Sequence, residues 1–196
     1  MPIHFVAEPK NGTSLVEKGL SKLAGRTNPL SGRGLDLAKL QVSQPHAVYD
    51  LRADAVAAGG GLASATRTGF RYFIAGEGAT VAGAEVHTDA TGAATLLANI
   101  NYGPYVAATA HALTQVTSLK PVSSGSYEAR VLRFSAIALM ALWLKADSGG
   151  ADIIYPLAPA PQPLQAEHAY SEADFLKAIL PLAQKRAEKK DPRSVP

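Results

Sequence analysis

Three segments between Gly69 and Asn99 alternate apolar and polar residues, and turn-forming residues separate them. The first runs over 69–75, the second over 81–88, and the third follows Asp89–Gly92 and ends near Asn99. Alternation with period two, broken by Gly, Asp and Asn, is typical of strands joined as an antiparallel meander. This pattern predicts an antiparallel sheet at the centre of the fold.

Successive side chains of a strand point to opposite faces of the sheet, so the pattern sorts the residues into two groups. The predicted core face carries Phe70, Tyr72, Ile74, Val86 and Leu97. The opposite face carries Arg71, Phe73, Val81, Glu85 and His87. Phe73 and Val81 are apolar on an otherwise polar face, so we expect a cover over them. The C-terminal helix or a second subunit would supply it, and the two residues are candidate interface residues.

Two main helices are predicted outside this meander. Pro104 suits the first turn of a helix that runs to about Leu119, because a missing N–H does no harm at that position. A second helix is expected over 172–189, with Ser171 and Asp174 at its start and a kink at Pro181. A proline-rich segment between 156 and 163 reads as a linker to this helix.

Two other segments are less well determined by the pattern. Residues 127–157 read as strands with a bend near Ser135, although a buried helix over 135–145 fits the same apolar run. Residues 46–58 are ambiguous, with helical spacing of their apolar residues and glycines at the end.

These elements together predict an α+β fold, with an antiparallel sheet of about five strands covered by the two main helices. Residues 1–45 are expected to form a loosely ordered N-terminal arm with one short helix. Residues 46–190 would form a single domain, and residues 191–196 a tail.

Composition and charge exclude several classes of protein. With 47% hydrophobic and 18% charged residues the chain is not a disordered polymer. Residues 1–34 and 185–196 each hold five basic and two acidic residues, so the net charge of +3 comes from the ends and the body is mildly acidic. Basic ends without a basic folded face do not predict nucleic-acid binding.

The absence of cysteine excludes thiol catalysis, disulfides and thiolate metal sites. The longest apolar run, over 134–144, is too short to cross a membrane, and the first residues lack the basic region of a signal peptide. We therefore expect a cytoplasmic protein without a membrane partner, and we expect no cofactor.

Glu85 and His87 place a carboxylate and an imidazole on the same side of one strand. Such a pair can serve in acid–base chemistry or as half of a metal site, but no further ligand with suitable spacing completes a metal site. The alternative is an ordinary polar strand face, with Glu85 diagonally across the hairpin from Arg71.

The turn from Asn99 to Tyr105 joins a strand end to a helix start and is the second candidate site. Free backbone N–H groups at a helix start can hold an anionic or polar ligand. The side chains of Asn99, Asn101, Tyr102 and Tyr105 lie around this point in the sequence. The alternative is that these residues cap the helix and pack locally.

No catalytic constellation is evident. The serines lie outside any Gly-x-Ser-x-Gly elbow, and the five histidines are scattered. The first hypothesis is therefore a non-enzymatic protein-binding or assembly module, in one form a homodimer. The second is a small-molecule-binding protein, or a weakly marked enzyme, that uses the Asn99–Tyr105 turn and the Glu85/His87 strand face.

Overall fold

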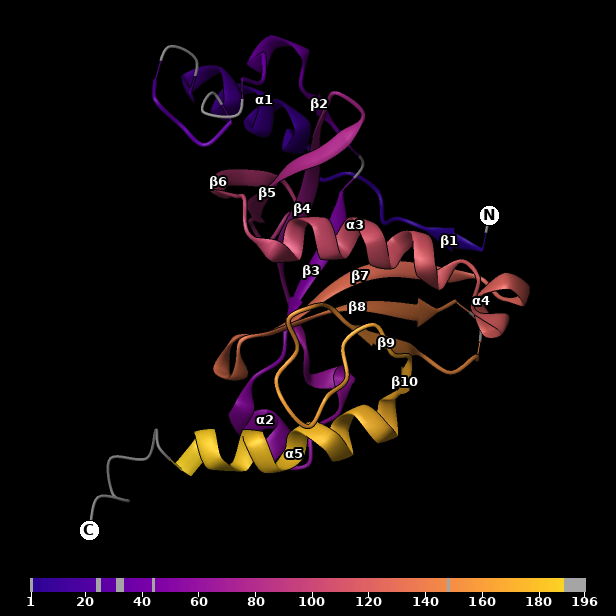
Figure 1. Cartoon of the computed structure of the whole chain (residues 1–196). Helices are drawn as coiled ribbons and strands as arrows, with labels where there is room; N and C mark the ends of the chain where they lie inside the picture. Colours follow the sequence, from indigo (N-terminus) through magenta and orange to yellow (C-terminus); the bar gives the residue numbers. More distant parts are fainter. Residues whose placement is uncertain (1, 24–25, 31–33, 44, 148, 189–196) are drawn as a thin grey trace.

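The computed structural model describes residues 2–23, 26–30, 34–43, 45–147 and 149–188 (Figure 1). Its strands are β1 (Ile3–His4), β2 (Gln41–Val42), β3 (His46–Asp50), β4 (Thr66–Gly76), β5 (Ala79–Thr88), β6 (Ala94–Asn101), β7 (Tyr127–Phe134), β8 (Leu139–Ala146), β9 (Ile153–Pro156) and β10 (Tyr170–Ser171). Its α-helices are α1 (Gly12–Leu23), α2 (Ala53–Ala57), α3 (Pro104–Val116), α4 (Lys120–Ser124) and α5 (Glu172–Glu188). Short 3₁₀ turns are η2 (Leu37–Lys39), η3 (Leu62–Ser64) and η4 (Ser135–Ile137).

The sheet consists of two antiparallel meanders whose first strands lie side by side. Its order is β10-β9-β8-β7-β3-β4-β5-β6, with β1 added to β7 and β2 added to β4. Strands β3 and β7 pair in parallel, from Ala47 opposite Arg130 to Asp50 opposite Arg133. The prediction of an antiparallel sheet of about five strands under two helices is therefore wrong. The fold is α+β, but the sheet is mixed; among the described residues it has ten strands, and five helices accompany it.

Strand β3 explains most of this error. It lies between β4 and β7, and His46, Ala47 and Val48 are all buried, so it lacks the apolar–polar alternation of a half-exposed strand. The helical spacing over 46–58 corresponds to a helix only from Ala53 to Ala57. A central strand and a short helix in succession produce the ambiguous pattern.

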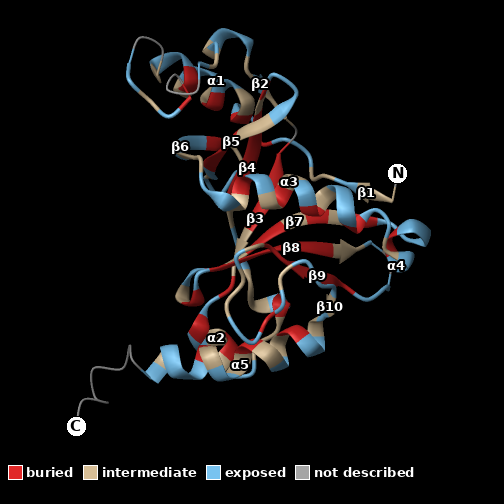
Figure 2. Cartoon of the chain, viewed as in Figure 1, coloured by how far each residue is buried: buried red, intermediate tan, exposed pale blue. Residues whose placement is uncertain are grey.

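Helices cover both faces of the sheet (Figures 1 and 2). Along β7, Val131 packs in the cluster with α3 and α4, whereas its neighbour Leu132 packs in the cluster with α2 and α5. Along β3, Val48 belongs to the α3 side and Ala47 to the cluster with α1. Since neighbouring residues of a strand face opposite ways, α3 and α4 cover one face, and α1 and the α2–α5 pair cover the two ends of the other.

The described part of the predicted N-terminal arm is packed against the sheet. Helix α1 buries Val16 and Leu20 against β4, β5 and β6, and β1 pairs with the start of β7. The amphipathic spacing of α1 is what makes this packing possible. The tail predicted at 191–196 lies outside the described residues.

The core face predicted for the 69–99 meander is confirmed. Phe70, Tyr72, Ile74 and Val86 are buried in the cluster beneath α1, and Leu97 packs against it. Val81, which the alternation predicts on the opposite face, packs against this same cluster. A β-bulge shifts the register between Ile74 and Ala75, and a one-residue shift reverses the face of a side chain.

The segment after β7 turns rather than continuing as a helix. The 3₁₀ turn η4 begins at Ser135, and Ala138 adopts a left-handed conformation (φ 54°) that starts the return strand β8. The bend predicted near Ser135 is confirmed, and the alternative helix over 135–145 is wrong. Among the described residues, no helix combines the length and hydrophobicity that crossing a bilayer requires.

Candidate functional site

A cavity of about 160 Å³ lies beneath the start of α3, on the face of the sheet that this helix covers. It is lined by residues of β4 to β8 and of α3: Arg71, Glu85, Asn101, Gly103, Tyr105, Val106, Arg133 and Met140. Sites for drug-sized ligands have roughly 300–1,000 Å³, so this cavity fits a smaller ligand.

Strand register brings the charged residues of the cavity together from distant parts of the sequence. Arg71 on β4 is directly opposite Glu85 on β5, rather than diagonal to it as expected. Arg133 on β7 is opposite Asp50 at the end of β3, across the parallel junction.

The four side chains form a row of alternating charge. Nη1 of Arg133 donates to Oε2 of Glu85 at 2.9 Å, and Nε of Arg133 donates to Oδ1 of Asp50 at 2.8 Å. Burial lowers the pKa of Arg133, but the bonds to Asp50 and the charge of Glu85 outweigh it, so the net shift is upward. Arg133 therefore stays charged, held between two carboxylates.

The guanidinium of Arg71 has weaker hydrogen-bond acceptors around it than that of Arg133. Its side chain is 2% exposed, and Nε lies 4.0 Å from Oε1 of Glu85, beyond hydrogen-bonding distance. Neither of these two atoms has a hydrogen-bond partner, and Nη1 donates to the thioether sulfur of Met140, a weak acceptor. Burial is the main reason that the pKa of Arg71 is lowered.

An unsatisfied buried polar atom destabilises a fold by about 1–3 kcal/mol, more when the group is charged. Two such atoms of opposite character lie 4.0 Å apart, both shut off from solvent, in two residues that line the cavity.

Because Gly83 has no side chain, it leaves space for the guanidinium of Arg71. A Cβ at this position would lie 3.0 Å from Nε of Arg71 and 3.2 Å from its Nη2. The guanidinium therefore lies against the backbone of β5, and a side chain at residue 83 would press on it.

The N-terminus of α3 also reaches the cavity. Its N-cap is Gly103, which lines the cavity and provides no side chain to accept from the first N–H groups of the helix. The first turn of a helix carries a partial positive charge, which adds to that of the two arginines.

Three of the six predicted ligand-binding residues line this cavity: Glu85, Asn101 and Tyr105. The Tyr105 hydroxyl is engaged elsewhere, within 2.7 Å of the Ala138 carbonyl oxygen and 2.9 Å of that of Pro159. Asn99 is exposed but accepts a hydrogen bond of 2.7 Å from the Asn101 amide.

The other two predicted residues lie away from the cavity lining. Tyr102 packs against the cluster beneath α1, and burial raises its pKa. His87 is exposed on β5, opposite Gly69.

Phe73, predicted to need a cover, is 9% exposed. Its ring centroid lies 4.8 Å from that of His46, and the His46 ring in turn lies 4.7 Å from that of Phe5. His46 of β3 thus contacts Phe73 within the same chain, and Phe5 of the N-terminal segment packs on His46. The interface role of Phe73 and Val81 stays a prediction.

Sequence reasoning missed Arg71 as a cavity residue and missed Arg133, Met140 and Asp50 altogether. The available signal was Arg133, a charged residue between the apolar pair Val131–Leu132 and the apolar run over 134–144. Its partner Asp50 lies 83 residues earlier, on a segment with a helical pattern, so spacing alone does not connect them.

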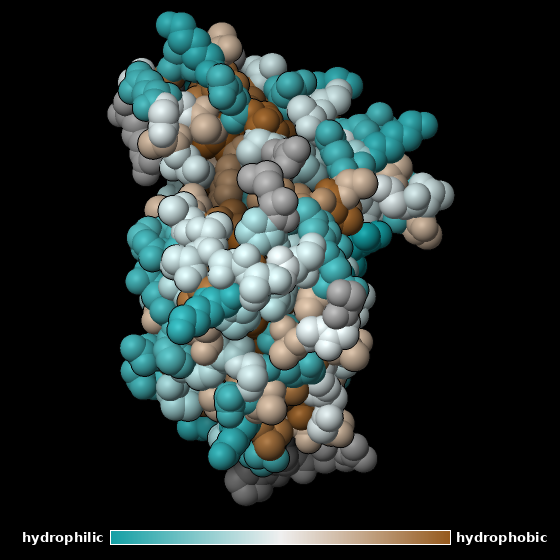
Figure 3. All heavy atoms as spheres, turned by 90° about the vertical axis from the view of Figure 1, so that its right-hand side faces the viewer, coloured by the Kyte–Doolittle hydropathy of each residue, from teal (hydrophilic) through white to brown (hydrophobic). Residues whose placement is uncertain are grey.

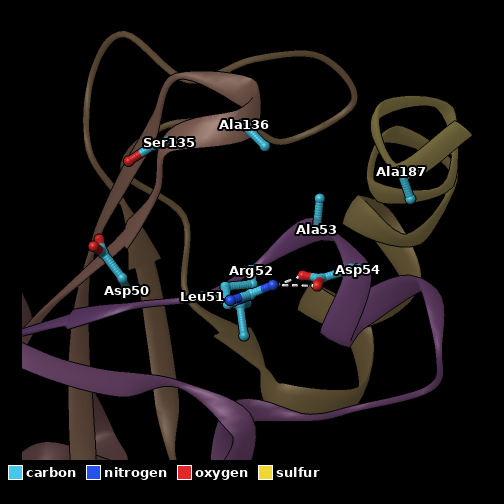
Figure 4. A pocket seen from close by; sticks show the side chains of 8 residues that line it. All are labelled: Asp50, Leu51, Arg52, Ala53, Asp54, Ser135, Ala136 and Ala187. Carbon is cyan, nitrogen blue, oxygen red and sulfur yellow. Dashed lines mark hydrogen bonds and ion pairs between the residues drawn. The ribbon is translucent and has the colours of Figure 1, made fainter. Parts of the chain in front are cut away.

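A larger pocket of about 410 Å³ opens on the other side of Asp50, toward α2 and the end of α5 (Figure 4). Its polar groups include Asp50, Ser135 and an exposed ion pair between Arg52 and Asp54, and alanines line much of the rest. Exposed pairs are well solvated and contribute little to binding. The smaller cavity, with its buried charges, is the stronger candidate.

In the part of the chain that the structure describes, no three His, Asp or Glu side chains gather closely enough to hold a metal ion. Comparisons with protein-family models, curated proteins and solved structures found no match for this chain.

Proposed function

We propose that this chain is a small-molecule-binding protein and that the cavity beneath α3 holds a small anionic ligand. The observation that carries the proposal is the Arg71 guanidinium, which is buried, belongs to a residue that lines the cavity, and lies 4.0 Å from its nearest carboxylate, beyond hydrogen-bonding distance. A buried cation without a hydrogen-bonded counter-ion gains most from an anion beside it. The proposal assigns no catalytic residue, and it includes the cytoplasmic location expected from the sequence.

Replacing Arg71 by methionine tests the proposal, because methionine keeps much of the side-chain volume and removes the charge. The probes are sodium acetate, lactate and phosphate, with ionic strength held constant by NaCl. We expect at least one of them to raise the melting temperature of the wild-type protein in a saturable way. At about 100 times the Kd, the stabilisation is about 2.7 kcal/mol, or a rise of about 5–10 °C.

The matched control is Arg67→Met, the same change at an exposed position on the same strand. The ligand-induced rise should persist in this variant and vanish in Arg71→Met. A rise that survives in Arg71→Met, or no rise with any of the three anions, would contradict the proposal.

A second candidate function, self-assembly, is favoured by a different feature, the edge strand β6. This eight-residue strand ends the sheet and contains no charged residue and no proline. Natural edge strands are commonly protected by such residues. Leu96, the one exposed large hydrophobic residue in the described part of the chain, is 57% exposed on this strand.

We propose that two copies of the chain pair through β6 in antiparallel fashion. On the face shown in Figure 3, hydrophilic and neutral residues predominate, and hydrophobic residues show in small separate areas. Edge pairing needs no broad apolar face, because backbone hydrogen bonds provide much of the contact.

Leu96→Lys should therefore convert a dimer to a folded monomer, since a lysine on each strand places like charges at the new pairing. Light scattering after size exclusion gives the mass, and circular dichroism reports folding. Ala107→Lys, at an exposed position of α3, is the control and should remain dimeric. A wild-type chain that stays monomeric at high concentration refutes this second candidate.

A further inference from the structure

Met140 on β8 is buried, and its thioether sulfur accepts a hydrogen bond from a charged group. Nη1 of Arg71 donates to this sulfur at 2.8 Å, and Met140 is opposite Arg133 in the pairing of β8 with β7. A thioether is a weak acceptor, whereas a guanidinium is a strong, charged donor. The sulfur is therefore the weaker partner in its contact with Arg71.

Oxidation of the sulfur would give Arg71 a better acceptor. Oxidation to the sulfoxide turns the apolar side chain of methionine into a polar one. In a core of hydrocarbon side chains this change destabilises a protein, because nothing pairs with the new oxygen. The sulfur of Met140 already has a charged donor beside it. A methionine side chain has three rotatable bonds, so the added oxygen can turn toward Nη1 of Arg71.

The cavity beneath α3 provides room for the added oxygen and a route to the sulfur. Met140 is one of the residues that line it, and its volume of about 160 Å³ is far larger than one oxygen atom. Gly103, which also lines the cavity, is exposed, so this part of the cavity wall borders solvent. We therefore expect hydrogen peroxide, a molecule little larger than water, to reach Met140 in the folded protein.

We propose that Met140 is an oxidation site and that the fold accepts its sulfoxide because Arg71 donates to the added oxygen. The sulfur attacks one oxygen of hydrogen peroxide, so that an S–O bond forms and the O–O bond breaks. The sulfur loses two electrons, and the departing hydroxide takes the proton of the transferred hydroxyl group and leaves as water. Methionine sulfoxide reductases reverse such an oxidation, so the modification is reversible.

Peroxide treatment of the full chain, followed by mass spectrometry of tryptic peptides, measures the reaction. The peptide 134–145 contains Met140 as its single methionine and should gain one oxygen atom. The rate in the folded protein should lie within about tenfold of the rate in urea, because susceptibility follows access to the sulfur. A Met140 that reacts only after unfolding contradicts the proposal.

The melting temperature of the oxidised protein tests whether the fold accepts the sulfoxide. It should rise by about 2–4 °C, since a buried charged donor gains a stronger acceptor. Met140→Leu is the matched control, and the same treatment should leave its melting temperature unchanged. A lower melting temperature for the oxidised wild-type protein than for the untreated one would overturn the proposal.

Arg71→Leu keeps the sulfur and removes the donor, so oxidation should lower the melting temperature of this variant. Arg67→Leu, at an exposed position of the same strand, should respond to oxidation as the wild type does. The same response in Arg71→Leu as in the wild type would show that Arg71 is not the partner of the oxygen and would refute the proposal. If Arg71→Leu does not fold, the direction of the wild-type shift decides. These measurements use no ligand, so their outcome is independent of the proposed function.

Discussion

Replacing Phe175 by alanine is expected to lower the free energy of unfolding by about 3–5 kcal/mol. The Phe175 side chain on α5 is fully buried in the cluster that joins α2 and α5 to the β7–β9 part of the sheet. Truncation leaves a cavity that the rigid strands beneath cannot fill. For a chain of this length the melting temperature should fall by about 6–20 °C.

Urea unfolding followed by circular dichroism measures this change. Lys177→Ala, two residues further along the same helix at an exposed position, controls for helix propensity and should change stability by less than about 0.5 kcal/mol. A Phe175→Ala protein as stable as the wild type would mean that α5 does not contribute to the core.

Stability should also fall as the pH drops from about 6.5 to about 4, through His46. The imidazole is buried between Phe5 and Phe73, and burial is the main cause that lowers its pKa to about 4. Its Nδ1 lies 3.3 Å from the Arg71 carbonyl oxygen, which favours the tautomer protonated there and leaves Nε2 without a partner. The folded protein thus holds His46 neutral.

The direction of this pH dependence follows from the protonation of His46 in the folded and unfolded protein. Above the unfolded-state pKa of about 6.5, His46 is neutral in both the folded and the unfolded protein, and its contribution to stability is greatest. Below this pH the imidazole takes up a proton in the unfolded protein but stays neutral in the folded protein, so unfolding is favoured. Each pH unit then removes about 1.4 kcal/mol, for a total of about 3 kcal/mol near pH 4.

Comparison with His46→Leu isolates this effect from the titrating carboxylates. The wild-type stability, relative to His46→Leu, should decline across this pH range, whereas His87→Leu, at an exposed position, should follow the wild type. Parallel pH profiles for the wild type and His46→Leu would show that His46 is not held neutral by the fold.

The parts of the fold that could be predicted are those with local signals. The 69–99 meander has alternating residues and turn glycines, which predict its core face correctly apart from Val81 at the bulge. The start of α3 at Pro104 was also marked by its sequence. Strand β3 has no such signal, because both of its faces are buried.

The candidate site was predictable to the same extent. Glu85, Asn101 and Tyr105 share the cavity because one hairpin and the following helix bring them together locally. Arg133 and Asp50 enter through the parallel pairing of β3 with β7. Without that pairing, no spacing argument places a second arginine beside Glu85.

The parallel β3–β7 junction sets a kinetic order for folding. Within each meander the longest connection between consecutive strands is residues 51–65, whereas Asp50 and Arg133 must meet across 83 residues. Such long-range contacts form slowly because loop closure precedes any gain from pairing. Until they meet, β3 and β7 both present open edges, the state in which a nascent chain is most exposed to pairing with another. The bond from Arg133 to Glu85 spans the same junction, so the cavity beneath α3 is completed only when the two halves have joined.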